Sequence, residues 1–194
     1  MKTKKIFKSA FTLSETIMVL LIIGVIVSIV FSTLTPNISK TQIKAQLNVA
    51  QSLISQAIVQ YQAENFCSGD LSTCDPFISE NPDIEHVFEE MFRYKFKLEQ
   101  DCGILLNQGC FAQENYTYPN ETQFSNPDSH EDYYKIRLQN GIAIAIFVPN
   151  PKCQDNICAR IIIDTNGPAP PNRLNQDTFE GIISKTQVRF DGAN

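Results

Sequence analysis

The chain has 194 residues, 43% of them hydrophobic and 19% charged, so it has room for one ordinary domain with an appended segment rather than for two full cores. Its formal net charge is −5, but the first ten residues hold four lysines and no acid, which leaves 12 basic against 21 acidic side chains, a net of −9, in the remainder. That balance argues against nucleic acid as a partner.

The basic N-terminus stands directly before a long apolar run. Residues 16–39 contain no charged side chain. Lysines next to a membrane segment are retained on the cytoplasmic side, and about 20 apolar residues in a helix cross a bilayer core. We therefore predict a membrane-spanning helix over residues 11–35, with the acidic remainder outside the cytoplasm. The run exceeds a cleavable secretory h-region, so it should stay attached to the mature protein.

Beyond Pro36 the apolar residues recur at steps of three and four, with amide, hydroxyl and lysine side chains between them. The recurring residues are Ile43, Leu47, Ala50, Ile54, Ala57, Ile58 and Tyr61. This spacing predicts that residues 36–65 continue the first helix in amphipathic form. The apolar face has to be buried against the rest of the chain.

Residues 66–130 show little periodicity, and we interpret them as a variable connecting region. One short helix is predicted within it, from Asp83 to Lys95, because Ile84, Val87, Phe88, Met91 and Phe92 share a helical face.

The last segment, residues 131–194, is rich in strand formers. Strands are predicted at residues 133–139, 141–148, 157–163, 178–184 and 187–190. Asn140-Gly141 between the first two is a strong hairpin signal. The expected fold class is α+β: a long N-terminal helix, membrane-spanning in its first half and amphipathic in its second, packed against a C-terminal antiparallel sheet of three to five strands.

Six cysteines fall as three local pairs, which suits a compartment where disulfides persist. The pairs are Cys67 with Cys74, Cys102 with Cys110, and Cys153 with Cys158. Six cysteines allow 15 connectivities. We favour nearest-neighbour bridging because each pair encloses a short segment with turn formers. Zinc binding would need closer Cys-x-x-Cys spacing or supporting histidines.

The most informative stretch is Lys8-Ser-Ala-Phe-Thr-Leu-Ser-Glu-Thr16, which the apolar helix follows at once. A carboxylate at the edge of a spanning helix is costly, so Glu15 is a candidate functional residue. If the chain were cut between Ala10 and Phe11, the new α-amino group would lie about one helical turn from Glu15. In a packed bundle, that carboxylate could meet the amine of a neighbouring copy and set the register of assembly.

These residues resemble the processing signal of type IV pilins and of type II secretion pseudopilins, in which a basic leader and a small residue precede Phe-Thr-Leu-x-Glu. The resemblance implies a pilin-like fold, removal of residues 1–10 by a prepilin peptidase, N-methylation of Phe11, and an assembly role for Glu15. Two departures are Ala10, where the family usually has Gly, and Ser14, where Ile or Val is common. Alternatively, Glu15 caps an uncleaved signal anchor and Phe11 is an interfacial aromatic anchor.

A second candidate site follows the third predicted strand. Asp164, Asn166 and Asp177 place oxygen ligands around a Gly/Pro-rich loop, and calcium prefers such ligands. Some pseudopilins hold a calcium ion in their C-terminal loop, so the resemblance raises the same idea. The alternative is a structural turn closed by hydrogen bonds from the Asx side chains.

We find no Ser-His-Asp, Cys-His or phosphate-loop motif, and we expect no enzymatic activity and no required cofactor. The sequence predicts a structural subunit of a type IV pilus or type II secretion pseudopilus, held in the bacterial inner membrane with its C-terminal domain in the periplasm and then polymerised into a periplasmic or extracellular filament. Expected partners are other pilin-like subunits, the peptidase, an assembly platform with its ATPase, and membrane lipid. The alternative is a signal-anchored periplasmic binding or enzymatic domain.

Overall fold

The computed structural model describes residues 13–67, 69–78, 83–147 and 151–190, without the side chains of residues 28–39 and 151. The chain divides into two compact units, residues 1–41 and 42–194, which are described separately.

The first element is α1, Leu13–Glu64, a helix of 52 residues. It ends where Phe66 adopts a left-handed conformation with φ 57°. There the Cys67 N–H donates to the Gln62 carbonyl at 3.1 Å and the Asn65 N–H to the Tyr61 carbonyl at 3.0 Å. Carbonyls at a helix end need such donors, and a left-handed residue supplies the reversal that brings the donors back.

The membrane-spanning first half of this helix was predicted wrongly. In the part of the chain that the structure describes, no helix combines the length and apolarity needed to cross a membrane. The fold is α+β, as predicted, but within the described residues its long N-terminal helix lacks the predicted membrane-spanning half.

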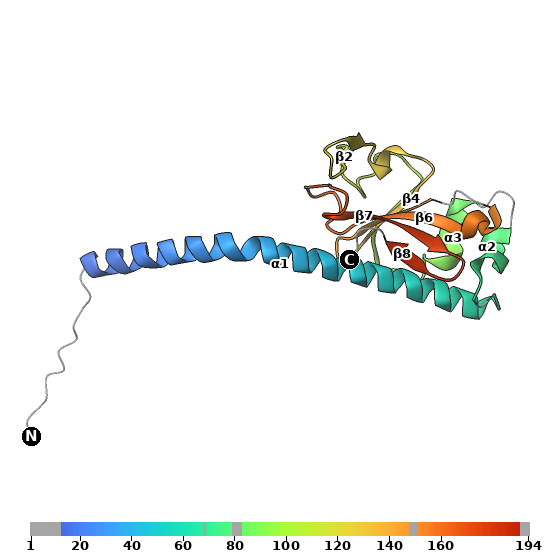
Figure 1. Ribbon diagram of the computed structural model, residues 1–194, viewed down its shortest axis with the longest axis horizontal. Helices are drawn as coiled ribbons and strands as arrows, with labels where there is room; N and C mark the ends of the chain where they lie inside the picture. The colour runs from blue at the N-terminus through green and yellow to red at the C-terminus, as the bar shows by residue number, and fades with distance from the viewer. Residues whose placement is uncertain (1–12, 68, 79–82, 148–150, 191–194) are drawn as a thin grey trace, which may run out of the picture. The chain divides into compact units, whose positions relative to one another are not determined.

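The second half of α1, in the unit 42–194, is amphipathic as its spacing predicts. Its buried apolar side chains are Leu47, Ala50, Ile54, Ala57, Ile58 and Tyr61. They belong to the main hydrophobic core together with one face of the sheet. Figure 1 shows this part of α1, cyan to green, running along one side of the sheet.

The connecting region holds more structure than the sequence predicts. It contains the short helices α2 (Asp75–Ile78) and α3 (Ile84–Met91) and a 3-10 turn at Leu71–Thr73. The Glu85 N–H donates to the Asp83 side chain at 3.0 Å, so Asp83 caps α3. The region also contains the first strand of the main sheet and a separate two-stranded hairpin, β2 (Tyr116–Thr117) and β3 (Gln123–Phe124).

The main sheet has six strands, in the order β1-β4-β5-β6-β7-β8, and every neighbouring pair is antiparallel. The bounds are Leu98–Gly103 (β1), Tyr134–Leu138 (β4), Ala143–Phe147 (β5), Ile157–Asp164 (β6), Thr178–Ser184 (β7) and Val188–Phe190 (β8). Gly141, with φ 87°, turns the chain between β4 and β5. β1 is an edge strand whose pairing with β4 contains two register shifts.

Both faces of the sheet are covered. One face packs on α1, α2 and α3 through side chains such as Ile136, Ile144 and Ile161. On the other face a second cluster joins Ala143, Ala145 and Ile162 to the segment around Phe111 and Tyr116. Figure 1 shows α1 on one side of the sheet and the β2 segment on the other.

The three disulfides join nearest neighbours, as the sequence analysis favours. Cys67 pairs with Cys74, Cys102 with Cys110 and Cys153 with Cys158. All six cysteines are buried. The bridges indicate an oxidising compartment outside the cytoplasm.

Candidate functional site

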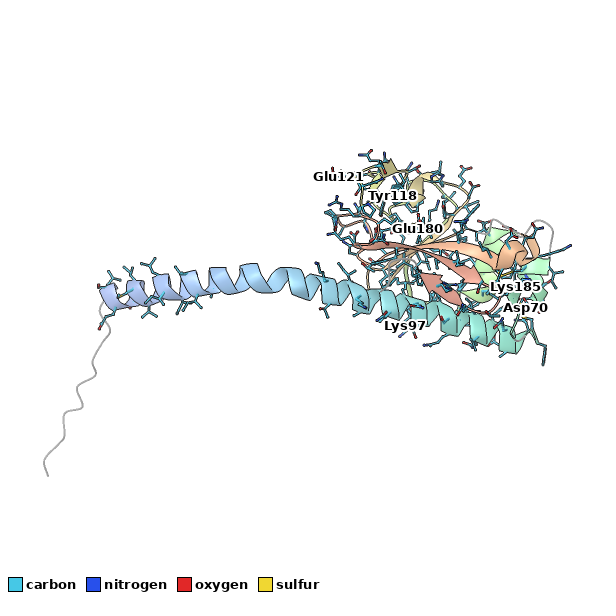
Figure 2. All side chains as sticks on the ribbon, viewed as in Figure 1. Asp70, Lys97, Tyr118, Glu121, Glu180 and Lys185 are labelled. Atoms are coloured by element: carbon cyan, nitrogen blue, oxygen red, sulfur yellow. A yellow bond between two sulfur atoms is a disulfide. The ribbon has the colours of Figure 1, made fainter. Side chains whose placement is uncertain are left out.

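The N-terminal part of α1 exposes apolar side chains on every side. Eleven large hydrophobic residues between positions 13 and 27 are each at least 45% exposed. They are Leu13, Ile17, Met18, Val19, Leu20, Leu21, Ile22, Ile23, Val25, Ile26 and Val27. Figure 2 shows the side chains of this segment projecting around the helix. An apolar surface of this extent marks an interaction site, because an isolated soluble helix face would carry polar groups.

Glu15 lies in the first turn of α1, and its side chain is exposed. A carboxylate is favoured there because the N-terminus of a helix carries partial positive charge. Residues three and four positions away share its face, and these are Met18 and Val19. The charge therefore stands against an otherwise apolar surface. The predicted cleavage residues Ala10 and Phe11 lie outside the described residues, so their relation to Glu15 stays a prediction.

The second candidate site closes the end of β6. Asp164 is fully buried, and the Tyr116 hydroxyl donates to its Oδ2 at 2.6 Å. The Asn166 N–H donates to Asp164 Oδ1 at 3.2 Å, which makes an Asx turn. Tyr116 comes from the segment over the outer face of the sheet, so this bond joins two parts of the chain 48 residues apart.

Asp177, also fully buried, organises the other side of the same loop. The Asn172 N–H donates to its Oδ2 at 2.8 Å, and the Arg173 N–H donates to its Oδ1 at 2.7 Å. The Thr165 N–H donates to the Asp177 carbonyl at 2.8 Å, so the turn after β6 is tied to the turn before β7. The structure thus brings Asp164 and Asp177 into one loop system.

Burial dominates the electrostatics of this loop. Loss of hydration is the main cause that raises the pKa of Asp164 to about 8. The Tyr116 hydrogen bond lowers this pKa in part, and the charge of Asp177 raises it further. Burial, followed by the Asp164 charge, raises the pKa of Tyr116. The Tyr116 hydrogen bond therefore favours the ionised carboxylate of Asp164, whereas burial favours its protonated form.

The two aspartates among the candidate calcium ligands are engaged in hydrogen bonds within the chain. Calcium takes six to eight oxygen ligands, and all four carboxylate oxygens of Asp164 and Asp177 already accept hydrogen bonds from the chain. The Asn166 amide nitrogen donates to the Ala169 and Pro170 carbonyls. Within the described residues, Asn166 Oδ1, Asn172 Oδ1 and Thr178 Oγ1 of this loop are buried without a hydrogen-bond partner. Across those ranges, no group of three or more His, Cys, Asp or Glu side chains is placed to hold a metal. The hydrogen-bonded turn accounts for both aspartates, and the calcium ion stays a prediction.

Comparison of the chain with protein-family models, curated proteins and solved structures finds no match.

Sequence reasoning overlooked two buried polar side chains that hold the outer layer. Tyr116 is one, and Lys135 is the other: its ammonium donates to the His130 carbonyl at 2.6 Å and to the Ile104 carbonyl at 3.1 Å. Burial lowers the pKa of Lys135. The sequence does carry a signal for this buried lysine, because Lys135 stands between apolar residues of a strand. The alternation of β4 puts Lys135 on the face of the sheet opposite Tyr134 and Ile136.

Proposed function

We propose that this chain is a pilin-like structural subunit that polymerises into a helical filament through the N-terminal part of α1. The observation that carries the proposal is the exposure of apolar side chains all around residues 13–27. A helix that is apolar on every side is stable only when it is buried on every side. Packing among copies of the same helix meets that requirement.

The free energy available to such packing is large. Burying one Leu, Ile or Val side chain contributes roughly 1.5–3 kcal/mol. Eleven such side chains therefore provide on the order of 15–30 kcal/mol per subunit before the cost of association is subtracted. That amount supports a permanent polymer rather than a transient encounter.

Glu15 supplies the register of the proposed filament. A carboxylate that becomes buried among apolar helices must be neutralised, since an unpaired buried charge costs several kcal/mol. After cleavage between Ala10 and Phe11, the α-amino group of Phe11 in a neighbouring copy is the proposed partner. Only one axial offset between helices places the two charges together, so the pair selects one stagger.

The disulfides support a location outside the cytoplasm for the assembled filament, either periplasmic or extracellular. In this proposal a prepilin peptidase processes the leader, and an assembly platform with its ATPase adds subunits. The rest of the chain, residues 42–194, has a structural role and presents its surface outward.

The test is filament formation by the full chain in its source cells. We expect Glu15→Gln to reduce filament yield at least about tenfold, which corresponds to a loss of about 1.4 kcal/mol per contact. Glu114→Gln, an exposed glutamate in a loop, is the matched control and should assemble normally. Normal assembly of Glu15→Gln would remove the role assigned to this carboxylate.

Mass spectrometry of the N-terminus tests the processing step. A mature chain that begins with methylated Phe11 is expected. An intact Met1 in assembled material would contradict the processing step and favour the alternative of a tethered, non-polymerising periplasmic domain.

A further inference from the structure

The two faces of the sheet are covered in different ways. The inner face packs on α1, α2 and α3 within a main core of 29 buried residues. The outer face carries residues 111–130, which we call the strap, attached through a separate cluster of eight buried residues (Figure 1). To this cluster β5 and β6 contribute only Ala143, Ala145 and Ile162. Small side chains bury little apolar area, so apolar packing holds the strap less strongly than it holds the helices.

Hydrogen bonds join the hairpin of the strap to the loop between β6 and β7. The Thr117 N–H donates to the Asn172 carbonyl at 3.1 Å, and the Leu174 N–H donates to the Thr117 carbonyl at 2.9 Å. Next to them, the Tyr116 hydroxyl donates to buried Asp164 at 2.6 Å. Water replaces such bonds when a segment opens, so the net contribution of each bond to closure is modest.

The C-terminal end of the strap is held by buried charged groups. Asp128 Oδ2 accepts from the Gly109 N–H at 2.7 Å, and the Asp128 carbonyl accepts from the Asn107 N–H at 2.9 Å. The His130 carbonyl accepts from the Lys135 ammonium at 2.6 Å. Asp128 and Lys135 are both fully buried. Burial removes water from both charged groups, and opening of the strap would restore it.

Buried polar atoms without a hydrogen-bond partner gather around the strap. Within the described residues there are six such side-chain atoms, and five of them lie in the strap or in the chain from Asn166 to Thr178. These five are Asn126 Oδ1, Asp128 Oδ1, Asn166 Oδ1, Asn172 Oδ1 and Thr178 Oγ1. A buried polar atom that lacks a partner raises the free energy of the closed state, and hydration relieves that cost.

We propose that the strap opens from the sheet as one unit while α1 and the main core stay folded. Openings of this kind occur where few apolar contacts oppose them, and the outer face has few. The open strap stays tethered at both ends, because Cys110 is bridged to Cys102 in β1 and the chain enters β4 at Tyr134. Opening uncovers the outer face of β5 and β6. The inference concerns the unit 42–194 alone and does not depend on the proposed polymerisation.

Native-state hydrogen exchange tests this opening in the full chain, kept soluble in detergent micelles. The reporters are the amides of Gly109, Thr117 and Leu174, whose hydrogen bonds close the strap, and the amides of residues 47–61 in α1. We expect the three strap amides to have similar protection factors, at least about tenfold below those of the α1 amides. Strap amides as well protected as the α1 amides would overturn the inference.

Tyr116→Phe tests whether the strap opens as one unit. The hydroxyl that is removed binds Asp164 at the hairpin, whereas the Gly109 N–H binds Asp128 at the other end of the strap. We expect the protection factor to fall at least about tenfold at Thr117 and by the same factor at Gly109. A fall confined to Thr117 and its neighbours would show local fraying and would contradict the proposal.

Tyr118→Phe is the matched control. Tyr118 lies in the same hairpin, between β2 and β3 (Figure 2), and its hydroxyl has no hydrogen bond within the described residues. Its ring lies 4.7 Å from that of Phe124, a contact that phenylalanine keeps. Protection factors should stay as in the unmodified chain. A fall equal to that of Tyr116→Phe would remove the role assigned to the Asp164 bond as the fastening of the strap.

Ile54→Val tests whether the strap opens independently of the main core. Ile54 lies in α1 and is fully buried in that core. The change should lower the protection factors of the α1 amides between about twofold and tenfold. The strap amides should not change, because Ile54 is packed in both the closed and the open state. An equal fall in both sets would mean that the strap opens only when the whole unit unfolds, which overturns the inference. Filament formation is not a readout here, so the outcome leaves the proposed function untouched.

Discussion

At the scale of single residues, Asp164 is the group whose protonation should set how stability depends on pH. Its carboxyl is buried, its folded pKa is about 8, and an unfolded aspartate titrates near 3.9. Between these two values the folded state binds more protons than the unfolded state. The contribution of Asp164 to stability is therefore fully present below about pH 4 and is lost as pH rises toward 8.

We expect urea unfolding of the unmodified chain to show this loss, with a slope of up to about 1.4 kcal/mol per pH unit between pH 5 and 7 from this residue. Asp164→Asn cannot titrate, so its slope should be flatter. Glu114→Gln, in an exposed loop, serves as the control and should keep the slope of the unmodified chain. Parallel slopes for Asp164→Asn and the unmodified chain would show that Asp164 does not titrate in this range.

The loop after β6 also depends on one glycine. Gly167 has φ 63°, and a Cβ placed there would lie 2.8 Å from the Gly141 carbonyl oxygen in the β4–β5 turn. Gly103 has a similar φ of 55° but open space around it. Comparing alanine substitutions at Gly103 and Gly167 therefore separates the cost of backbone strain from the cost of a steric clash.

Gly103→Ala should cost about 1–2 kcal/mol of unfolding free energy, because only the left-handed backbone is strained. Gly167→Ala should cost about 1–3 kcal/mol more, because the carbonyl must also move. Chemical denaturation of both variants measures the difference. Equal losses of unfolding free energy in the two variants would mean that the turns holding Gly167 and Gly141 can move apart without cost.

At the scale of elements, α3 is tied to the sheet by one aromatic contact. The Phe88 and Tyr134 rings stack with their centroids 4.0 Å apart, and Phe88 is fully buried. Phe88→Ala should reduce the unfolding free energy by about 3–5 kcal/mol. His86→Ala, on the exposed face of the same helix, should change it by less than about 0.5 kcal/mol. A loss below about 1 kcal/mol for Phe88→Ala would show that α3 is not part of the cooperative core.

These elements differ in how well the sequence predicts them. The β4–β5 hairpin was predictable because Asn140-Gly141 stands between β-rich runs, and α3 because Asp83 precedes a clear helical period. The first strand was missed because Leu98-Glu-Gln-Asp-Cys-Gly103 contains no β-branched residue. Its place in the sheet comes from pairing with β4, a tertiary effect that local propensity does not report.

The candidate sites also depend on tertiary contacts that local sequence patterns do not report. The sequence marks Asp164 as a candidate oxygen ligand at a strand end, but its hydrogen-bond partner Tyr116 lies 48 residues earlier, and no local pattern links the two residues. The calcium hypothesis rests on the same Asx side chains, and in the folded loop the carboxylates of Asp164 and Asp177 accept hydrogen bonds while the Asn166 amide donates them. Glu15 and the surrounding apolar residues were recognisable because their signal is entirely local.

At the scale of the whole molecule, three short disulfide loops supply a large share of stability. They join cysteines 7, 8 and 5 positions apart. Cys102 lies in β1 and Cys158 in β6, and the other four cysteines lie outside the strands. In the chain-entropy model, closing a loop of this size stabilises the fold by roughly 2–2.5 kcal/mol. Three such loops together approach about 7 kcal/mol, comparable to the entire stability of a typical domain.

Complete reduction should therefore unfold residues 42–194 near room temperature, whereas loss of one bridge should not. We expect Cys153→Ser with Cys158→Ser to lower the unfolding free energy by about 2 kcal/mol, because it releases the shortest loop. Denaturation of the oxidised chain, the reduced chain and this double variant, followed by tyrosine fluorescence, measures the three states. A reduced chain as stable as the oxidised one would mean that the six-stranded sheet and α1 hold the fold without the bridges, and that the cysteine pairs serve another purpose.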